Sequence, residues 1–235
     1  MIKPEIIYED KELVVLDKPA GWVVNRAKSV KEETIQDWIK SNVKSQMSKV
    51  DNYRNGIVHR LDKETSGVLI VAKTLFAFKN LQTQFKQRRI GKKYTAFVHG
   101  KVEPEEGGVN VPVGRLPWNR ERFGVLPGGK SAVTYYKVIK YLKDDKNNFY
   151  TLLELNPKTG RTHQIRVHLK YLGHPIVADE FYAGRKTSKA DRLWCSRLFL
   201  HASEITFQHS KSNKSVTLVS DLPNDLQLCL KRFNN

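Results

Sequence analysis

Short apolar runs separated by polar turns predict a chain built mainly of strands. Residues 6–8 and 13–16 have the apolar, β-branched character of a strand pair, and the polar residues 9–12 predict the turn between them. Six of the seven residues from Gly67 to Lys73 are apolar or glycine, which predicts a buried strand. Further strands are predicted at 94–100, 133–139, 149–155, 201–207 and 215–219.

Helical spacing of apolar residues is confined to a few segments. It predicts a helix within 33–43, a second helix that Thr74 caps, a third over 162–172 and a short helix near the C-terminus. Residues 104–130 are rich in glycine, proline and charge, and they predict hairpins or a loop. Because strands outnumber helices, we predict a single domain over 1–235 of the α+β class, with a mixed, mainly antiparallel central sheet flanked by helices and loops.

The balance of charge narrows the class of partner. The 235 residues include 41 Lys and Arg against 24 Asp and Glu, a formal net charge of +17. This excess is larger than solubility requires, and it favours nucleic acid over an anionic membrane surface. Cys195 and Cys229 have neither CxxC nor metal-ligand spacing, which suits a reducing cytosol. Because we find no secretory signal and no apolar stretch near the ~18 residues of a spanning helix, we expect a cytoplasmic protein without a membrane anchor.

One carboxylate stands in a distinctive setting just before the buried strand. Asp62 follows His59 and Arg60, precedes Lys63, and is separated from the strand by the turn residues 65–67. A carboxylate on a loop docked against a rigid strand is well placed for catalysis, and nearby positive charge would keep it ionised. The alternative is a turn aspartate that hydrogen-bonds its own backbone, and this segment alone leaves both interpretations open.

A second stretch turns out of a strand and places Arg161 at the predicted start of a helix. A guanidinium stays charged and holds a carboxylate in a forked geometry, so Arg161 could orient and ionise a catalytic aspartate. The alternative is a surface arginine at a helix start, which the helix dipole disfavours. Arg166 lies off the apolar stripe, and we expect it to contact phosphates. His163 and His168 are spaced poorly for two ligands on one helix face, so we expect no metal site.

Basic residues occur beside aromatic ones at two further places. Lys92 and Lys93 lead into a strand at Tyr94, which could stack on a base or transfer a proton, although a packed strand tyrosine is the alternative. Residues 118–123 mix Trp, Arg and Phe, which suits single-stranded or flipped RNA but also fits a charged loop with one anchoring aromatic. We find no phosphate-binding glycine loop, GxSxG, HExxH or CxxC motif.

In order along nearly the whole chain, these stretches resemble the RluA-type pseudouridine synthases. His59 to Gly67 resembles the catalytic HRLDxxTSG segment of that family, and Thr159 to Arg166 resembles its second signature. The two motifs together, at this separation, are highly specific. Further matches are the Lys-Pro-x-Gly turn within 17–21, the strand entry at 93–94, the glycine-lysine segment 128–134, the segment 173–176 and the late motif 197–202.

The resemblance implies a cofactor-free isomerase that flips a uridine out of a stem-loop of ribosomal or transfer RNA and converts it to pseudouridine. It implies Asp62 as the nucleophile, Tyr94 as the residue that stacks on the uracil and assists proton removal, and Arg161 as the partner of Asp62. The residues expected to bind RNA are His59, Arg60, Lys63, Lys92, Lys93 and Arg166.

The resemblance also sets expectations about organisation. Many members carry an N-terminal RNA-binding domain of the S4 type, and we expect none here because the matching pattern begins almost at residue 1. We expect a monomer that requires no protein partner. Two other functions remain as alternatives: a non-catalytic RNA-binding protein with the same fold, and a nucleoside-bond hydrolase that releases the base.

Overall fold

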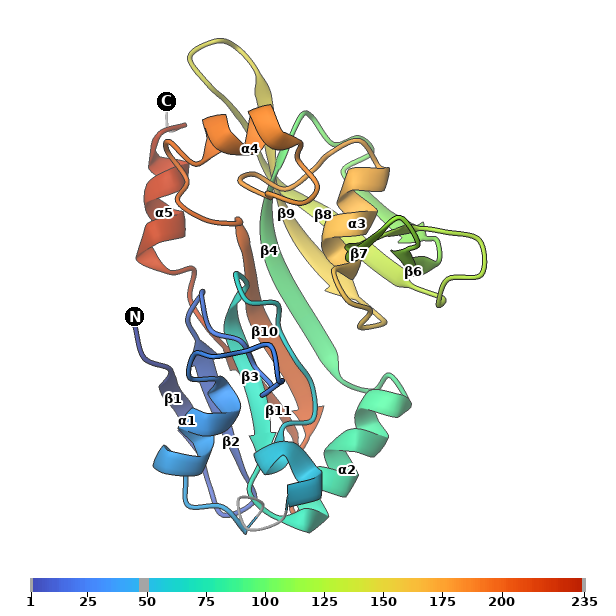
Figure 1. The fold of residues 1–235 in the computed structure, drawn as a ribbon. Helices are drawn as coiled ribbons and strands as arrows, with labels where there is room; N and C mark the ends of the chain where they lie inside the picture. The colour runs from blue at the N-terminus through green and yellow to red at the C-terminus, as the bar shows by residue number, and fades with distance from the viewer. Residues whose placement is uncertain (1, 47–50, 234–235) are drawn as a thin grey trace. The chain divides into compact units, whose positions relative to one another are not determined.

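The computed structural model describes residues 2–46 and 51–233, which form two compact units (Figure 1). Unit 1 is built from the described residues of 1–91 and 202–221, and unit 2 from those of 92–201 and 222–235. Each unit has its own strands and apolar core, and the single domain predicted over 1–235 stays a prediction. No helix in the described part of the chain is long and apolar enough to cross a membrane.

The sheet of unit 1 has the strand order β1–β2–β3–β10, with β11 paired to β10. The pairs β1–β2, β2–β3 and β10–β11 are antiparallel, which confirms the hairpin predicted near the N-terminus. Every residue of β3 is buried, which explains why its sequence is a continuous apolar run rather than an alternation. The strands are β1 (Glu5–Glu9), β2 (Leu13–Lys18), β3 (Ser66–Ala72), β10 (Leu200–Gln208) and β11 (Ser215–Val219).

The described residues of unit 1 also form two α-helices and a short 3₁₀ helix. The helices are α1 (Ile35–Asn42), η2 (Asp51–Gly56) and α2 (Leu75–Lys86). The predicted cap of α2 is confirmed, because the Thr74 side chain accepts a hydrogen bond from the Ala77 backbone. Phe78 and Leu81 of α2 lie in the same buried cluster as β2 and β3, so this helix covers the strand that follows the Asp62 loop.

The main sheet of unit 2 has the strand order β4–β9–β8–β5, and each neighbouring pair is antiparallel. A separate two-stranded hairpin is formed by β6 and β7, so the glycine- and proline-rich segment predicted as hairpins or a loop contains three strands. The predicted α+β class with mainly antiparallel pairing is confirmed. The strands are β4 (Gly91–His99), β5 (Glu106–Asn110), β6 (Val113–Leu116), β7 (Asn119–Val125), β8 (Val133–Lys143) and β9 (Phe149–Pro157).

The helices of unit 2 are α3 (Gln164–Tyr171), α4 (Arg185–Asp191) and α5 (Asn224–Lys231). The predicted start of α3 at residue 162 is wrong by two residues, because His163 has a left-handed backbone (φ +56°) that cannot continue into a helical turn. Helix α4 was not predicted, since its sequence RKTSKAD is short and has no apolar stripe.

Candidate functional site

Asp62 lies on a loop of unit 1 between η2 and β3, and its side chain is half-buried. The loop closes on itself where the Thr65 backbone donates to the Asp62 carbonyl oxygen at 3.2 Å. It enters β3 through Gly67, whose φ of +111° strains any other residue, and a Cβ there would collide with the Ala202 carbonyl oxygen. The backbone from Asp62 to Gly67 is therefore tightly specified.

A buried ammonium holds the other side of the Asp62 loop. Lys18 has no solvent exposure, and its Nζ donates to the carbonyl oxygens of Pro19 (3.0 Å), Trp22 (3.1 Å) and Lys63 (3.3 Å). The Lys63 carbonyl, one residue after Asp62, also accepts from the Gly21 backbone at 2.8 Å. The Lys-Pro-Ala-Gly turn thus cradles the loop. The sequence signal for this role is a lysine that ends a strand, two positions after the apolar residues 13–16.

The basic neighbours of Asp62 have different surroundings. His59 Nε2 accepts a hydrogen bond from the Ile70 backbone at 3.0 Å, and its ring stacks on Phe85. His59 thus anchors the loop to β3 and α2, and its contact with RNA stays a prediction. Lys63 pairs with Glu32 at 3.1 Å in an exposed setting. Arg60 is exposed, and its RNA contact stays a prediction, as does that of Lys63.

Arg161 lies on the turn between β9 and α3 in unit 2, and one glutamine organises this turn. The buried Gln164 Oε1 accepts from the Thr159 hydroxyl (2.7 Å) and from the Arg161 backbone (3.0 Å). Its Nε2 donates to the Val133 carbonyl oxygen and to the Thr134 hydroxyl, each at 3.0 Å. Arg161 Nε donates to the Ser131 carbonyl oxygen at 3.1 Å. Because the helix begins only at Gln164, Arg161 precedes it and does not open it as predicted.

Arg166 has a structural role that the sequence did not reveal. It is 4% exposed, and its Nε and Nη2 donate to the two carboxylate oxygens of the buried Asp179 at 2.8 and 2.7 Å. The Asp179 carboxylate also accepts from the backbone of Phe181 and Tyr182. A guanidinium enclosed in this forked pair is not available to a phosphate, so the expectation that Arg166 binds RNA is corrected.

Strand β4 carries the remaining predicted residues. The side chains alternate along a strand, so Lys92 and Tyr94 share one face and Lys93 lies on the other, where it pairs with Glu154 at 3.8 Å. Tyr94 is half-buried and packs against the core of unit 2. Tyr94, Lys92 and Arg161 thus belong to unit 2, whereas Asp62 belongs to unit 1, and the ion pair implied for Asp62 and Arg161 stays a prediction.

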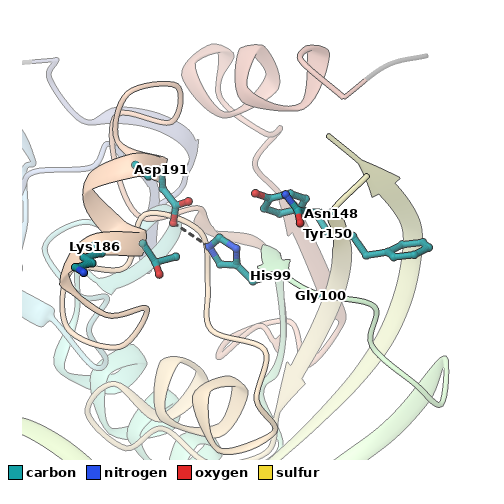
Figure 2. Close-up of a pocket in the computed structure, with 9 residues that line it drawn as sticks. His99, Gly100, Asn148, Tyr150, Lys186 and Asp191 are labelled. Carbon is teal, nitrogen blue, oxygen red and sulfur yellow. Dashed lines mark hydrogen bonds and ion pairs between the residues drawn. The ribbon is translucent and has the colours of Figure 1, made fainter. Parts of the chain in front are cut away.

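One further cavity lies in unit 2 and contains none of the predicted site residues (Figure 2). It has a volume of about 600 Å³ and is lined by the ends of β4, β9 and α4. Two of its lining side chains are in direct contact, since His99 Nε2 lies 2.9 Å from an oxygen of the Asp191 carboxylate (Figure 2). The nearly buried Asp191 carboxylate also accepts from the Ala178 backbone, which shows that this pair fixes the chain around residue 178.

Comparison with known proteins gives a consistent result. A family model described as RNA pseudouridylate synthase matches residues 12–171. An uncharacterised RNA pseudouridine synthase of Bacillus subtilis is 37% identical over 94% of this chain and 70% of its own length. The ribosomal large subunit pseudouridine synthase D of Nitrosomonas europaea is 40% identical over 98% of this chain.

The match to solved structures covers the whole described fold. The structure of human RNA pseudouridylate synthase domain containing 1 superposes with a TM-score of 0.75 at 25% identity, over 97% of this chain and 87% of that one. The chain spans 65% of the length of the Nitrosomonas europaea relative, and the same share of a relative from Synechocystis that is 35% identical.

Proposed function

This chain belongs to the RNA pseudouridylate synthase family, and we propose that it isomerises uridine in ribosomal or transfer RNA to pseudouridine. The observation that carries the proposal is the anchoring of the HRLDxxTSG loop around Asp62. Lys18 and Gly21 bind the Lys63 carbonyl oxygen from outside the loop, and Gly67 fixes the backbone where the loop joins β3. A nucleophile must be held within a fraction of an ångström of its target, and a loop anchored on both sides meets that requirement.

We propose Asp62 as the nucleophile that attacks the target uridine so that the bond from C1′ to N1 breaks. The uracil then rotates and C5 bonds to C1′, while the bond between Asp62 and the uridine breaks and regenerates the carboxylate. N1 gains a proton, and the hydrogen at C5 leaves as a proton. Because the product is an isomer of the substrate, no oxidant or reductant is consumed. Tyr94 is proposed to stack on the uracil and to assist removal of the C5 proton. Arg161 is proposed to keep Asp62 ionised and oriented.

The target base is enclosed by RNA structure, so the enzyme must bind phosphates and extrude a nucleotide. The net charge of +17 supplies the electrostatic attraction. Trp118, at the turn between β6 and β7, is 77% exposed, and the neighbouring arginines Arg115, Arg120 and Arg122 are exposed as well. An exposed indole flanked by guanidinium groups suits stacking on an unpaired base. We propose a stem-loop as the substrate, and a monomer acting in the cytoplasm.

The test is release of tritium from RNA labelled at uridine C5, prepared from cells that lack the gene. Formation of the bond from C1′ to C5 displaces that hydrogen, so release reports the isomerisation itself. We expect release by the wild type and by the matched control Glu64→Gln, and none by Asp62→Asn. Release by Asp62→Asn would reject the assignment of the nucleophile. Free uracil in place of a modified nucleotide would identify a hydrolase instead.

A further inference from the structure

Lys92 occupies an unusual position at the start of β4. Its side chain is half-buried, and its Nζ lies 4.0 Å from the position that a Cβ on Gly160 would occupy. Gly160 immediately precedes Arg161, so the Lys92 ammonium lies against the turn that carries the second signature. On the same strand, Tyr94 points to the same face as Lys92.

The charge of Lys92 is not neutralised by the protein. Among the described residues its ammonium makes no hydrogen bond and no ion pair. The charged residue that most affects its pKa is another cation, Lys158. Burial, with a further contribution from Lys158, lowers the pKa of Lys92 to about 8. Enclosing an ammonium without a counter-charge is unfavourable, so the arrangement is suited to an anion that arrives from outside.

Two other lysines of the same strand region show the contrast. Lys93, on the opposite face of β4, pairs with Glu154 at 3.8 Å. Lys101, just beyond the other end of β4, pairs with Glu103 at 2.6 Å, and this hydrogen bond raises its pKa. Both therefore have acidic partners within the protein, whereas the Lys92 ammonium lies beside Gly160 and the positive charge of Lys158 lowers its pKa.

We propose that Lys92 and Lys158 form a binding site for a backbone phosphate of the RNA substrate, next to the uridine that is isomerised. The proposal rests on the proposed function and names a specific contact within it. A phosphate between two ammonium groups forms charge-assisted hydrogen bonds and removes their mutual repulsion. A Cβ at Gly160 would lie 4.0 Å from the Lys92 ammonium, so the glycine leaves this side of the ammonium uncovered by a side chain.

Binding of a phosphate should be visible in the titration of Lys92 itself. In the full chain with carbon-13-labelled lysine, we expect the signal that Lys92→Arg removes to titrate near pH 8 and to shift upward in pH by a unit or more with uridine 3′,5′-bisphosphate. Neutral uridine should leave it unchanged, and Lys101 should respond to neither compound. A Lys92 signal that ignores the bisphosphate would overturn the proposal, whether or not the protein isomerises RNA.

Kinetics on the labelled RNA separate binding from chemistry. We expect Lys92→Met to raise KM about tenfold with little change in kcat, and Lys101→Met to change KM by less than about twofold. In the wild type, KM should rise as the pH is increased above about 8, whereas Lys92→Arg should remove that rise because arginine does not titrate there. A fall in kcat at constant KM would overturn the proposal and identify Lys92 as a proton-transfer group.

Discussion

The Asp62 loop of unit 1 and the Arg161 turn of unit 2 are each organised by one buried polar side chain, but the two side chains differ in charge. In unit 1 the Lys18 ammonium donates to three carbonyl oxygens, one of which belongs to Lys63 beside Asp62. In unit 2 the neutral amide of Gln164 accepts from Thr159 and Arg161 and donates to Val133 and Thr134.

The difference follows from the groups that each side chain must bind. In the Asp62 loop these are carbonyl oxygens, which accept hydrogen bonds from an ammonium. The same cation beneath Arg161 would repel the guanidinium, so a neutral side chain with both donors and acceptors is the better support there. In both segments a buried side chain fixes the backbone of a turn. It is a charged lysine in the Asp62 loop and a neutral glutamine in the Arg161 turn.

The largest expected effect is the removal of the buried ammonium. Lys18→Met should lower the free energy of unfolding by about 3 kcal/mol, because the carbonyl oxygens of Pro19 and Trp22 lose the ammonium donor and that of Lys63 keeps only its bond from Gly21. Urea denaturation measures the loss, and the exposed Lys11→Met is the control. A loss below about 1 kcal/mol would mean that water replaces the ammonium and that the cradle is not specific.

Removing the guanidinium from the second segment should act on turnover. Arg161→Ala is expected to lower kcat about 100-fold, because its proposed role is to pair with Asp62 and orient it. The measurement is kcat on the labelled RNA. Arg185→Ala, an exposed arginine at the start of α4, is the matched control. A kcat close to that of the wild type would count against the ion pair.

Removing the neutral amide of Gln164 should lower the free energy of unfolding less than removing the Lys18 ammonium. Gln164→Leu should lower the free energy of unfolding by about 2 kcal/mol, since a similar volume is kept while the four hydrogen bonds of the amide are lost. Comparing this loss with that of Lys18→Met by urea denaturation tests the contrast directly. Equal losses would show that charge does not distinguish the two supports.

The smallest effect is a pH dependence at the end of the Gln164 network. His168 is fully buried, its Nδ1 is 3.0 Å from the Thr134 hydroxyl, and burial lowers its pKa. The unfolded chain therefore binds a proton that the folded chain excludes, so stability should fall as the pH drops below about 6.5, by at most ~1.4 kcal/mol per pH unit. Calorimetry should show a smaller change in Tm for His168→Gln. An equal change would assign the effect to other groups.

Much of this protein followed from its sequence. The apolar run after Gly67 predicted β3, and Thr74 predicted the start of α2, because burial and capping leave local, periodic signals. The two signatures predicted the family. The same local logic failed for α4, whose seven residues have no apolar stripe, and at His163, where a left-handed residue delays the start of α3.

Only the tertiary structure decided what the charged side chains do. The sequence predicted that Arg166 contacts phosphates, but in the structure its guanidinium is buried and pairs with Asp179, thirteen residues away. The sequence predicted His59 as a charged neighbour of Asp62, whereas in the structure its Nε2 accepts a hydrogen bond from the Ile70 backbone. Three lysines have different surroundings in the structure. Lys18 donates to carbonyl oxygens, Lys92 has no acidic partner among the described residues, and Lys93 pairs with Glu154. The periodicity of a sequence records which positions are buried, whereas the partner of a buried charge depends on segments that meet only when the chain folds.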